Sequence, residues 1–192
     1  MRPTLLIGLI LTAFMIAPSS AFADTDRRLD GGEVLLFTHD VDGQSIPKVN
    51  VYGVVDAPPE DIWAIISDCD KYVGVLPRVD KAKIVSRSGS TVTCDVTLGL
   101  PFPISDLRAV TEAEHTTGPP SWKREWTLVE GDYEVNEGHW TLTRFQGDES
   151  RTLVVYSLNA VPKNRVPNRV QRRAQEGSMQ DIIKSLREHT AK

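Results

Sequence analysis

Residues 54–79, VVDAPPEDIWAIISDCDKYVGVLPRV, decide the fold, because an apolar strand runs there directly into helical sequence. Pro58 and Pro59 suit the start of a helix, and Glu60 and Asp61 then fall in its first turn, where the helix dipole favours negative charge. Apolar residues spaced i, i+3, i+4 follow and form a stripe that a short helix would bury. Turn-forming residues then bound a second short helix. The stretch therefore predicts one strand followed by two short helices.

Apolar and polar residues alternate through most of the chain from residue 81 to residue 161. Short alternating segments separated by Gly, Pro and Asp turn signals are typical of an antiparallel sheet. The predicted strands are 33–38, 47–55, 81–88, 91–100, 106–116, 121–130, 133–145 and 151–161. About seven strands emerge, depending on whether the count starts at residue 33 or 47. The polar segment 24–32 is expected to be loose.

The C-terminal segment, residues 162–191, shows no alternation, and Pro167 fits the start of a helix. The helix would run about 20 residues, or about 30 Å at 1.5 Å per residue. Several residues fall roughly along one of its faces: Val170, Ala174, Gly177, Ile182 and Leu186. The predicted fold class is α+β, a curved antiparallel sheet with the long helix across its concave side. The space beneath the helix is either filled by large side chains or left as a hydrophobic cavity.

The first 23 residues have the form of a cleaved signal peptide. Arg2 gives a positive start, residues 5–16 are apolar, and Ala21-Phe22-Ala23 is a small-x-small cleavage pattern. The apolar run is too short to span a bilayer. We therefore expect residues 24–192 to be a single domain, with its core at 47–190, that is exported to the periplasm or secreted.

Charge is unevenly distributed along the chain. Residues 24–192 hold 21 of the 22 basic and all 26 acidic side chains, but from Lys163 onward eight are basic and three are acidic. An acidic body argues against nucleic acid as a partner, whereas the basic end either contacts anionic headgroups or is a solvated helix face. Cys69 and Cys94 form either a disulfide, as an oxidising compartment permits, or two buried thiols.

Motifs of common enzyme classes are missing from the sequence. It has no Gly-x-Ser-x-Gly elbow, no phosphate-binding loop and no His-Glu-x-x-His. The four histidines lie on separate elements and the cysteines lack Cys-x-x-Cys spacing. We predict no catalytic residue, no metal and no cofactor, although residues far apart in sequence can still converge in space.

Aromatic residues and two arginines mark the sheet as a candidate site. Trp126, Trp140 and Tyr156 fall on adjacent predicted strands, where they either line a pocket or form ordinary core. Arg124 and Arg144 each sit among apolar same-face neighbours, where an unpaired charge is costly. They either bind the polar head of a ligand or pair with carboxylates of the chain.

Several segments together resemble the START-like superfamily, which includes the birch-pollen-allergen fold and the polyketide cyclase and lipid transport group. VVDAPPEDIWAIISDCDKYVGVLPRV resembles its strand and Ala-Pro-x-Glu helix start. PFPISDLRAV resembles its proline-bearing loop and following strand, although Leu107 interrupts the family pattern there. GHWTLTRF and the segment 166–189 resemble its tryptophan strand and closing helix. The likeness covers about residues 47–190.

The resemblance implies a helix-grip fold with a cavity between sheet and helix, in a superfamily whose members mostly carry lipids, sterols, quinones or polyketides. We therefore expect an exported, non-enzymatic protein that binds or transports a hydrophobic small molecule, with a lipid as the leading candidate. In the proline-bearing loop 100–105 (LPFPIS), Leu100, Phe102 and Ile104 would face the pocket or a membrane, unless Phe102 fills the core. Val170, Ala174 and Gly177 would line the pocket from the helix. The alternatives are a polyketide cyclase-like enzyme with the same pocket and a protein-interaction module with a filled core.

Overall fold

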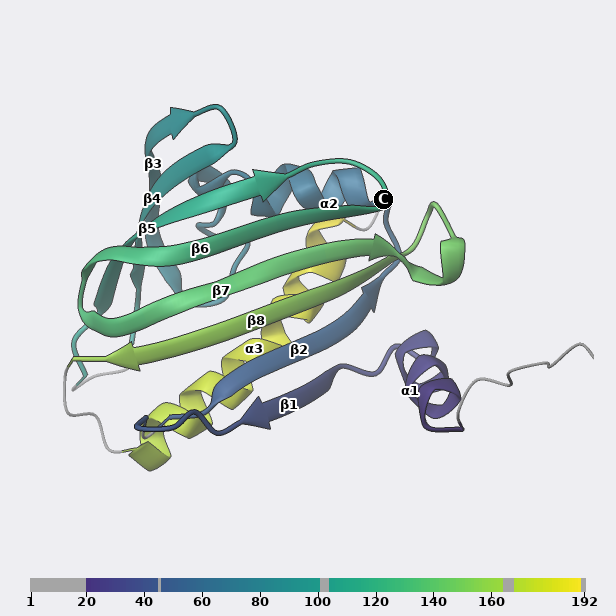
Figure 1. The fold of residues 1–192 in the computed structure, drawn as a ribbon, viewed down its shortest axis with the longest axis horizontal. Helices are drawn as coiled ribbons and strands as arrows, with labels where there is room; N and C mark the ends of the chain where they lie inside the picture. Colours follow the sequence, from purple (N-terminus) through teal and green to yellow (C-terminus); the bar gives the residue numbers. More distant parts are fainter. Residues whose placement is uncertain (1–19, 45, 101–103, 164–167, 191–192) are drawn as a thin grey trace, which may run out of the picture.

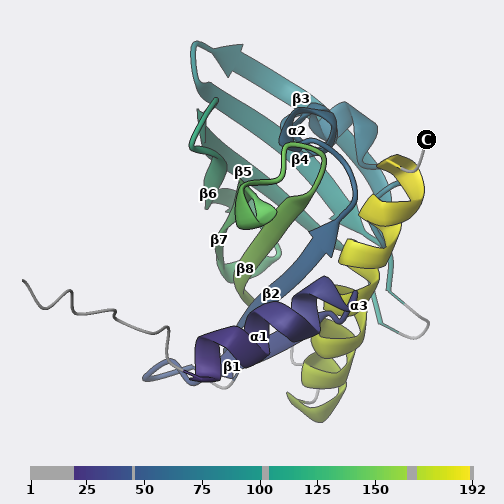
Figure 2. The same cartoon turned by 90° about the vertical axis from the view of Figure 1, so that its right-hand side faces the viewer.

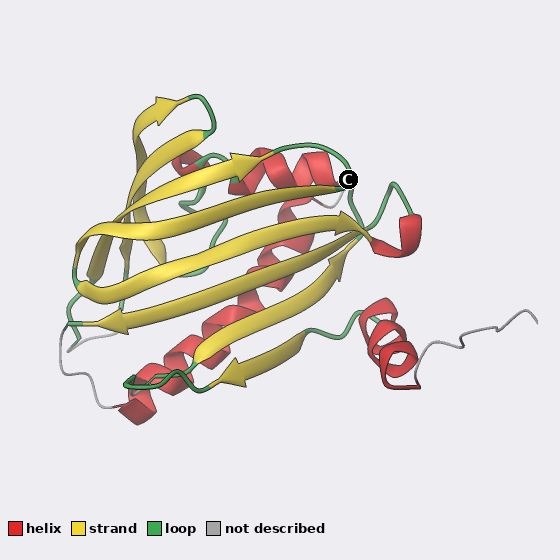
Figure 3. Cartoon of the chain, in the orientation of Figure 1, coloured by secondary structure: helices red, strands yellow, loops and turns green. Residues whose placement is uncertain are grey.

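The computed structural model describes residues 20–44, 46–100, 104–163 and 168–190, which form an α+β fold (Figures 1 and 3). Eight antiparallel strands form one sheet in the order β1-β2-β8-β7-β6-β5-β4-β3. The strands are β1 (Leu35–His39), β2 (Lys48–Val55), β3 (Val79–Ser88), β4 (Thr91–Leu98), β5 (Leu107–Thr116), β6 (Ser121–Gly131), β7 (Tyr133–Arg144) and β8 (Thr152–Pro162). The prediction of a curved antiparallel sheet is confirmed, with the segment near residue 35 counted as a full strand.

Register shifts in the strand pairs accompany the curvature of the sheet. Irregularities fall in β3 between Val79 and Lys81 and again between Ile84 and Ser86. Others fall in the β5–β6 pair opposite Val110 and Thr111, and in β7 between Tyr133 and Val135. An extra residue in one strand of a pair bends that strand and increases its twist. The sheet therefore has a concave side, which the C-terminal helix covers (Figure 2).

The opening stretch folds as its sequence predicts. β2 leads into α2 (Pro59–Ile66), which buries Ile62 and Ile66 completely, and then into the 3-10 turn η1 (Cys69–Lys71). The Tyr72 hydroxyl donates a hydrogen bond to the carbonyl oxygen of Ile66 at 2.6 Å and so joins the two helices. A disulfide between Cys69 of η1 and Cys94 of β4, with 6.3 Å between the Cα atoms, ties this helical segment to the sheet.

The long helix α3 (Asn168–Thr190) crosses the concave side of the sheet diagonally (Figures 1 and 2). Its residues Ile183 and Leu186 are fully buried. A Cβ atom at Gly53 of β2 would lie only 2.5 Å from Cγ2 of Ile183, so the absence of a side chain there lets the helix approach the sheet. Arg187 Nε donates a hydrogen bond to the carbonyl oxygen of Val54 at 2.8 Å and fixes the last turns of α3 on β2.

An additional helix, α1 (Ser20–Asp30), covers most of the segment predicted to be loose, so that prediction is wrong. The sequence there is polar and has no apolar periodicity; its buried anchor is Leu29, which packs with Leu35 and Phe145. Most of the predicted signal peptide, residues 1–19, lies outside the described residues, and residues 20–23 belong to α1. Within the described ranges, no helix is long and apolar enough to span a membrane.

Candidate functional site

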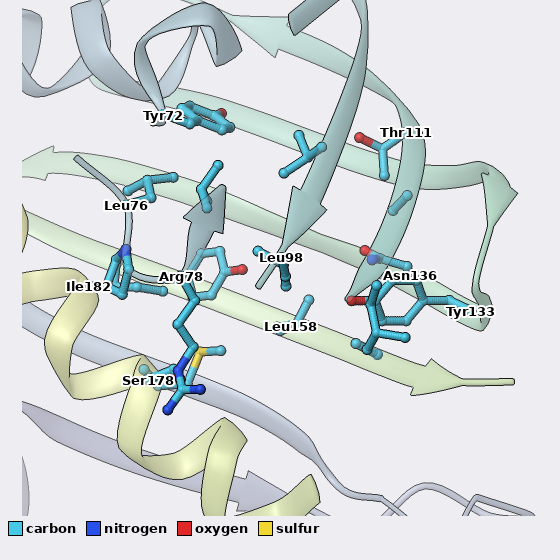
Figure 4. Close-up of a pocket in the computed structure, with 18 of the residues that line it drawn as sticks. Tyr72, Leu76, Arg78, Leu98, Thr111, Tyr133, Asn136, Leu158, Ser178 and Ile182 are labelled. Atoms are coloured by element: carbon cyan, nitrogen blue, oxygen red, sulfur yellow. The ribbon is translucent and has the colours of Figure 1, made fainter. Parts of the chain in front are cut away.

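A cavity of about 300 Å³ lies between the concave face of the sheet and α3 (Figure 4). Strands β3 to β8 line it on one side, and Ser178, Met179 and Ile182 line it from α3. Most of the lining is apolar, which suits a site that removes a hydrophobic ligand from water. The alternative of a completely filled core is therefore wrong.

Three large aromatic side chains form one wall of the cavity. The Tyr156 ring stacks on Trp126 at a centroid distance of 5.7 Å and lies 4.3 Å from the centroid of Trp140. Trp126 is held in place by a 3.0 Å hydrogen bond that its Nε1 donates to Oδ1 of Asn136. A Cβ atom at Gly138 would lie 2.6 Å from the Trp126 ring, so this glycine makes room for the indole. These aromatics line the pocket and belong to the core at once.

Arg78 and Arg124 are the charged residues among the described residues that line the cavity, which include no Asp, Glu, Lys or His. Arg124 is only 4% exposed. Its Nη2 donates a hydrogen bond to Sγ of Cys94 at 3.4 Å, and its guanidinium lies 6.0 Å from the Tyr72 ring and 5.7 Å from the Trp126 ring. Its Nε has no hydrogen-bond partner among the described residues. The cavity thus contains a buried cation without a counter-ion from the described part of the chain.

Burial changes the titration of groups around the cavity. It raises the pKa of the phenols of Tyr72, Tyr133 and Tyr156, which therefore stay neutral at physiological pH. His115, which pairs with Arg124 in the β5–β6 register, has its pKa lowered to about 4, first by burial and then by the positive charge of Arg124. His115 is therefore neutral at neutral pH and adds no second charge beside the cavity.

The predicted ligand-contact residues fall into three groups. Leu100, Ile104, Arg124, Trp126, Trp140 and Tyr156 line the cavity. Phe102 lies outside the described residues, and Val170 and Ala174 lie in the part of α3 whose side chains are not described. Gly177 is exposed, and a Cβ atom built on it would meet no atom within 4 Å.

Arg144 corrects the sequence prediction, because it does not line the cavity. It is the last residue of β7, and its Nη1 lies 3.2 Å from Oε1 of Glu149 in the turn that follows. The period-two face that carries Trp140 continues to Arg144, but the cavity ends before it. For Arg144 the alternative of pairing within the chain is therefore the right one.

Sequence reasoning missed several residues of the lining, among them Tyr72, Arg78, Thr111, Tyr133 and Asn136 (Figure 4). Thr111 sits two residues along the alternating strand from Ala109, so its face could have been read from the period of two. Arg78 has a left-handed backbone, with φ of 62°, just before β3. No simple pattern signals such a residue, because its position depends on how the loop after η1 meets the sheet.

Solved structures of low sequence identity share the fold. A STAR-related lipid transfer protein fragment from Xanthomonas axonopodis matches with a TM-score of 0.73 and 15% identity, over 83% of this chain and 94% of that one. Human StAR-related lipid transfer protein 5 matches with a TM-score of 0.69 and 14% identity, over 90% of this chain and 92% of that one. The Zhui aromatase/cyclase from a Streptomyces species matches with a TM-score of 0.57 and 12% identity, over 82% of this chain and 92% of that one.

The sequence comparisons address the family directly. No curated protein matches the chain in a sequence search. Residues 55–187, however, match the family model described as polyketide cyclase / dehydrase and lipid transport. This match covers more than half of the chain, from the end of β2 into α3, and every described residue of the cavity lining except Ile46. The chain therefore belongs to the polyketide cyclase / dehydrase and lipid transport family, and it shares its fold with the STAR-related lipid transfer proteins named above.

Proposed function

We propose that the protein is an exported, non-enzymatic carrier that binds a lipid in the cavity between the sheet and α3. The observation that carries this proposal is the apolar, aromatic-walled cavity of about 300 Å³. Burial of an acyl or ring system there would supply about 25 cal/mol per Å² of apolar surface, less the cost of ordering the ligand. The volume of the cavity is at the small end of the usual range for ligand pockets, which favours a ligand with one chain or one ring system.

Gentle purification followed by organic extraction and mass spectrometry tests the carrier directly. We expect an apolar molecule to be recovered in near-stoichiometric amount and chemically unchanged after prolonged incubation with the protein. Conversion of the bound molecule into a product would instead identify a cyclase-like enzyme. Repeated recovery of nothing, together with no binding of the neutral dye N-phenyl-1-naphthylamine, would reject the carrier.

A cavity-filling variant places the binding site. Ala109 lines the cavity and is 6% exposed, so the ring of Ala109→Phe would occupy ligand space. We expect this variant to lose most of its dye binding. Val129 is exposed and does not line the cavity, so Val129→Phe serves as the matched control with unchanged binding. Equal binding by both variants would place the ligand elsewhere.

Export is the second part of the proposal. The charge and cleavage pattern of residues 1–23 supports it, and so does the Cys69–Cys94 disulfide, since disulfides persist in oxidising compartments. Expression of the full chain in a Gram-negative host tests this by fractionation and N-terminal mass analysis. We expect periplasmic protein that begins at Asp24. An uncleaved chain retained in the cytoplasm would contradict the proposal.

Exchange with membranes would use the basic sequence 165–173. Four arginines concentrate there in the sequence: Arg165, Arg169, Arg172 and Arg173. Basic residues near an anionic surface contribute about 1 kcal/mol each. Ligand transfer to vesicles containing phosphatidylglycerol should therefore be faster than transfer to neutral vesicles, and the difference should shrink in high salt. Equal rates for both vesicles would remove this part of the proposal.

A further inference from the structure

We propose that the bound lipid is a single-chain anionic amphiphile whose carboxylate or phosphate head binds Arg124 inside the cavity. This inference rests on the proposed carrier function and adds to it the charge and the orientation of the ligand. It predicts that the charged end of the ligand is buried, while its chain extends along the apolar walls.

The charge of the cavity differs from that of the whole protein. The chain has a net charge of −4, yet the described residues of the cavity lining carry two positive charges and no negative one. Arg124 is buried and Arg78 is exposed, so one cation lies inside and one lies near solvent. A neutral ligand would need neither charge, and a cationic ligand would be repelled. The lining is therefore built to receive an anion.

Arg124 has hydrogen-bonding capacity that the described part of the protein leaves unused. Its Nη2 donates a hydrogen bond to the sulfur of Cys94, a weak acceptor, and its buried Nε has no partner among the described residues. A desolvated guanidinium without an anion is unfavourable. Its planar donors match two oxygens of a carboxylate or a phosphate. An oxyanion of the ligand would supply the missing charge and acceptors.

Two carboxylates on neighbouring strands are engaged elsewhere. Asp95 lies 2.9 Å from Nε of Arg108 and 3.9 Å from Nζ of Lys83, on the outer side of the sheet. Glu114 accepts hydrogen bonds from the hydroxyls of Ser90 and Thr91. Because the described lining of the adjoining cavity holds no Asp or Glu, a ligand in the cavity can provide the anion at Arg124.

The position of Arg124 along the strands sets the direction of the ligand. Arg124 pairs with Trp140, and the other end of the cavity is lined by residues such as Leu107 and Tyr133, close to Gly131. Gly131 lies seven positions after Arg124 in β6, which corresponds to about 23 Å at 3.3 Å per residue. Leu100, Leu107 and Ala160 supply an apolar path at that end. A head at Arg124 leaves one extended chain to follow this path.

A dodecyl series tests the charge of the ligand. Dodecanoate, dodecyl phosphate, methyl dodecanoate and dodecanol share one chain and differ in the head group. Each would compete with N-phenyl-1-naphthylamine for the full chain. Because hydrogen bonds to charged groups are worth more than neutral ones, we expect at least one anion to bind about tenfold or more tightly than the ester and the alcohol. The ratio of dodecanoate to dodecyl phosphate then identifies the head.

The variant Arg124→Met tests the position of the head, since it removes the charge and keeps a long side chain. We expect it to lower anion affinity about tenfold or more and to leave ester affinity nearly unchanged. Arg144→Met, which removes an arginine outside the cavity, is the matched control and should change neither affinity. An equal loss for anion and ester in Arg124→Met would show a merely structural role and overturn the inference.

The outcomes separate this inference from the carrier function beneath it. If the dye binds and the anions displace it no better than the neutral compounds, the ligand is not anionic, but the carrier stands. If neither the dye nor any dodecyl compound binds, the carrier function itself fails. Because the head-group comparison uses the unaltered protein, it decides the question even if Arg124→Met does not fold.

Discussion

At the scale of single residues, Arg124 and Arg144 show how one sequence pattern leads to two environments. Each lies on the face of its strand that carries buried tryptophans, Trp126 in β6 and Trp140 in β7. Arg144 reaches the end of its strand and pairs with Glu149 in the following turn. Arg124 is buried mid-sheet beside the cavity and has no ion pair with a described residue. Position along the strand, and not the pattern, decides which arginine is available to a ligand.

The buried guanidinium also has a consequence for stability. Replacing an unpaired buried charge by an apolar side chain of similar length removes its desolvation penalty, although it also removes contacts with Tyr72 and Trp126. We expect ligand-free Arg124→Met to be at least as stable as the wild-type protein. Thermal denaturation of delipidated protein measures this. A large fall in the melting temperature would mean that Arg124 serves the fold rather than the ligand.

His115 predicts a pH dependence of stability. Its pKa is lowered to about 4 in the folded protein, against an ordinary value of 6.5, so the unfolded chain binds a proton more readily between these values. The contribution of His115 is therefore present above pH 6.5 and is lost as the pH falls towards 4. Denaturant titrations at pH 7.5 and 4.5 should show a smaller loss of unfolding free energy in His115→Gln than in the wild type. His39→Gln, at an exposed position, should behave like the wild type.

At the scale of elements, the position of α3 determines whether a cavity exists. The C-terminal half of the helix is fixed to β2 through Ile183 and through the Arg187 hydrogen bond to Val54. Ser178, Met179 and Ile182 of the same helix line the cavity instead. The helix thus packs tightly on the outer part of the sheet and stands off from its centre.

Two glycines test this arrangement in opposite directions. In Gly53→Ala the new methyl group would clash with buried Ile183, so we expect a loss of roughly 1–3 kcal/mol in unfolding free energy. Gly177 lies exposed in α3 with free space around it, so Gly177→Ala should gain about 0.5–1 kcal/mol. Chemical denaturation measures both changes. Slower ligand exchange in Gly177→Ala, at unchanged affinity, would instead support a hinge at this position.

Most strands were predictable from sequence because one face is more buried than the other, which produces a period of two. β6, predicted as 121–130, is observed as Ser121–Gly131. Helix α1 was not predictable in this way, because its polar sequence is anchored through Leu29 and the signal lies in tertiary contact. The aromatic wall followed from residue type, but Arg78 and Asn136 joined the lining through loop geometry and cross-strand neighbours. Whether the space beneath α3 is open depends on the packing of the whole sheet.

At the scale of the whole molecule, the disulfide joins the early helical segment to the sheet. It closes a loop across a sequence separation of 25 residues, which in the chain-entropy account corresponds to about 3 kcal/mol. We expect dithiothreitol, or the double change of Cys69 and Cys94 to serine, to lower the unfolding free energy by about that amount. Equilibrium denaturation with and without reductant measures it. Identical curves would show that the bond adds nothing to stability.

The strand order has a consequence for how the chain is made. β2 pairs with β8, so that Val51 lies opposite Tyr156, and the helix that covers both comes last in the sequence. Such distant pairing slows folding, because the entropy of closing a long loop is lost before the contacts of the two strands stabilise the chain. A nascent chain that has released only its first half therefore holds β2 with one edge unpaired. Chaperone protection, or passage across a membrane before folding, would suit a protein in which β8 and α3 are synthesised long after β2.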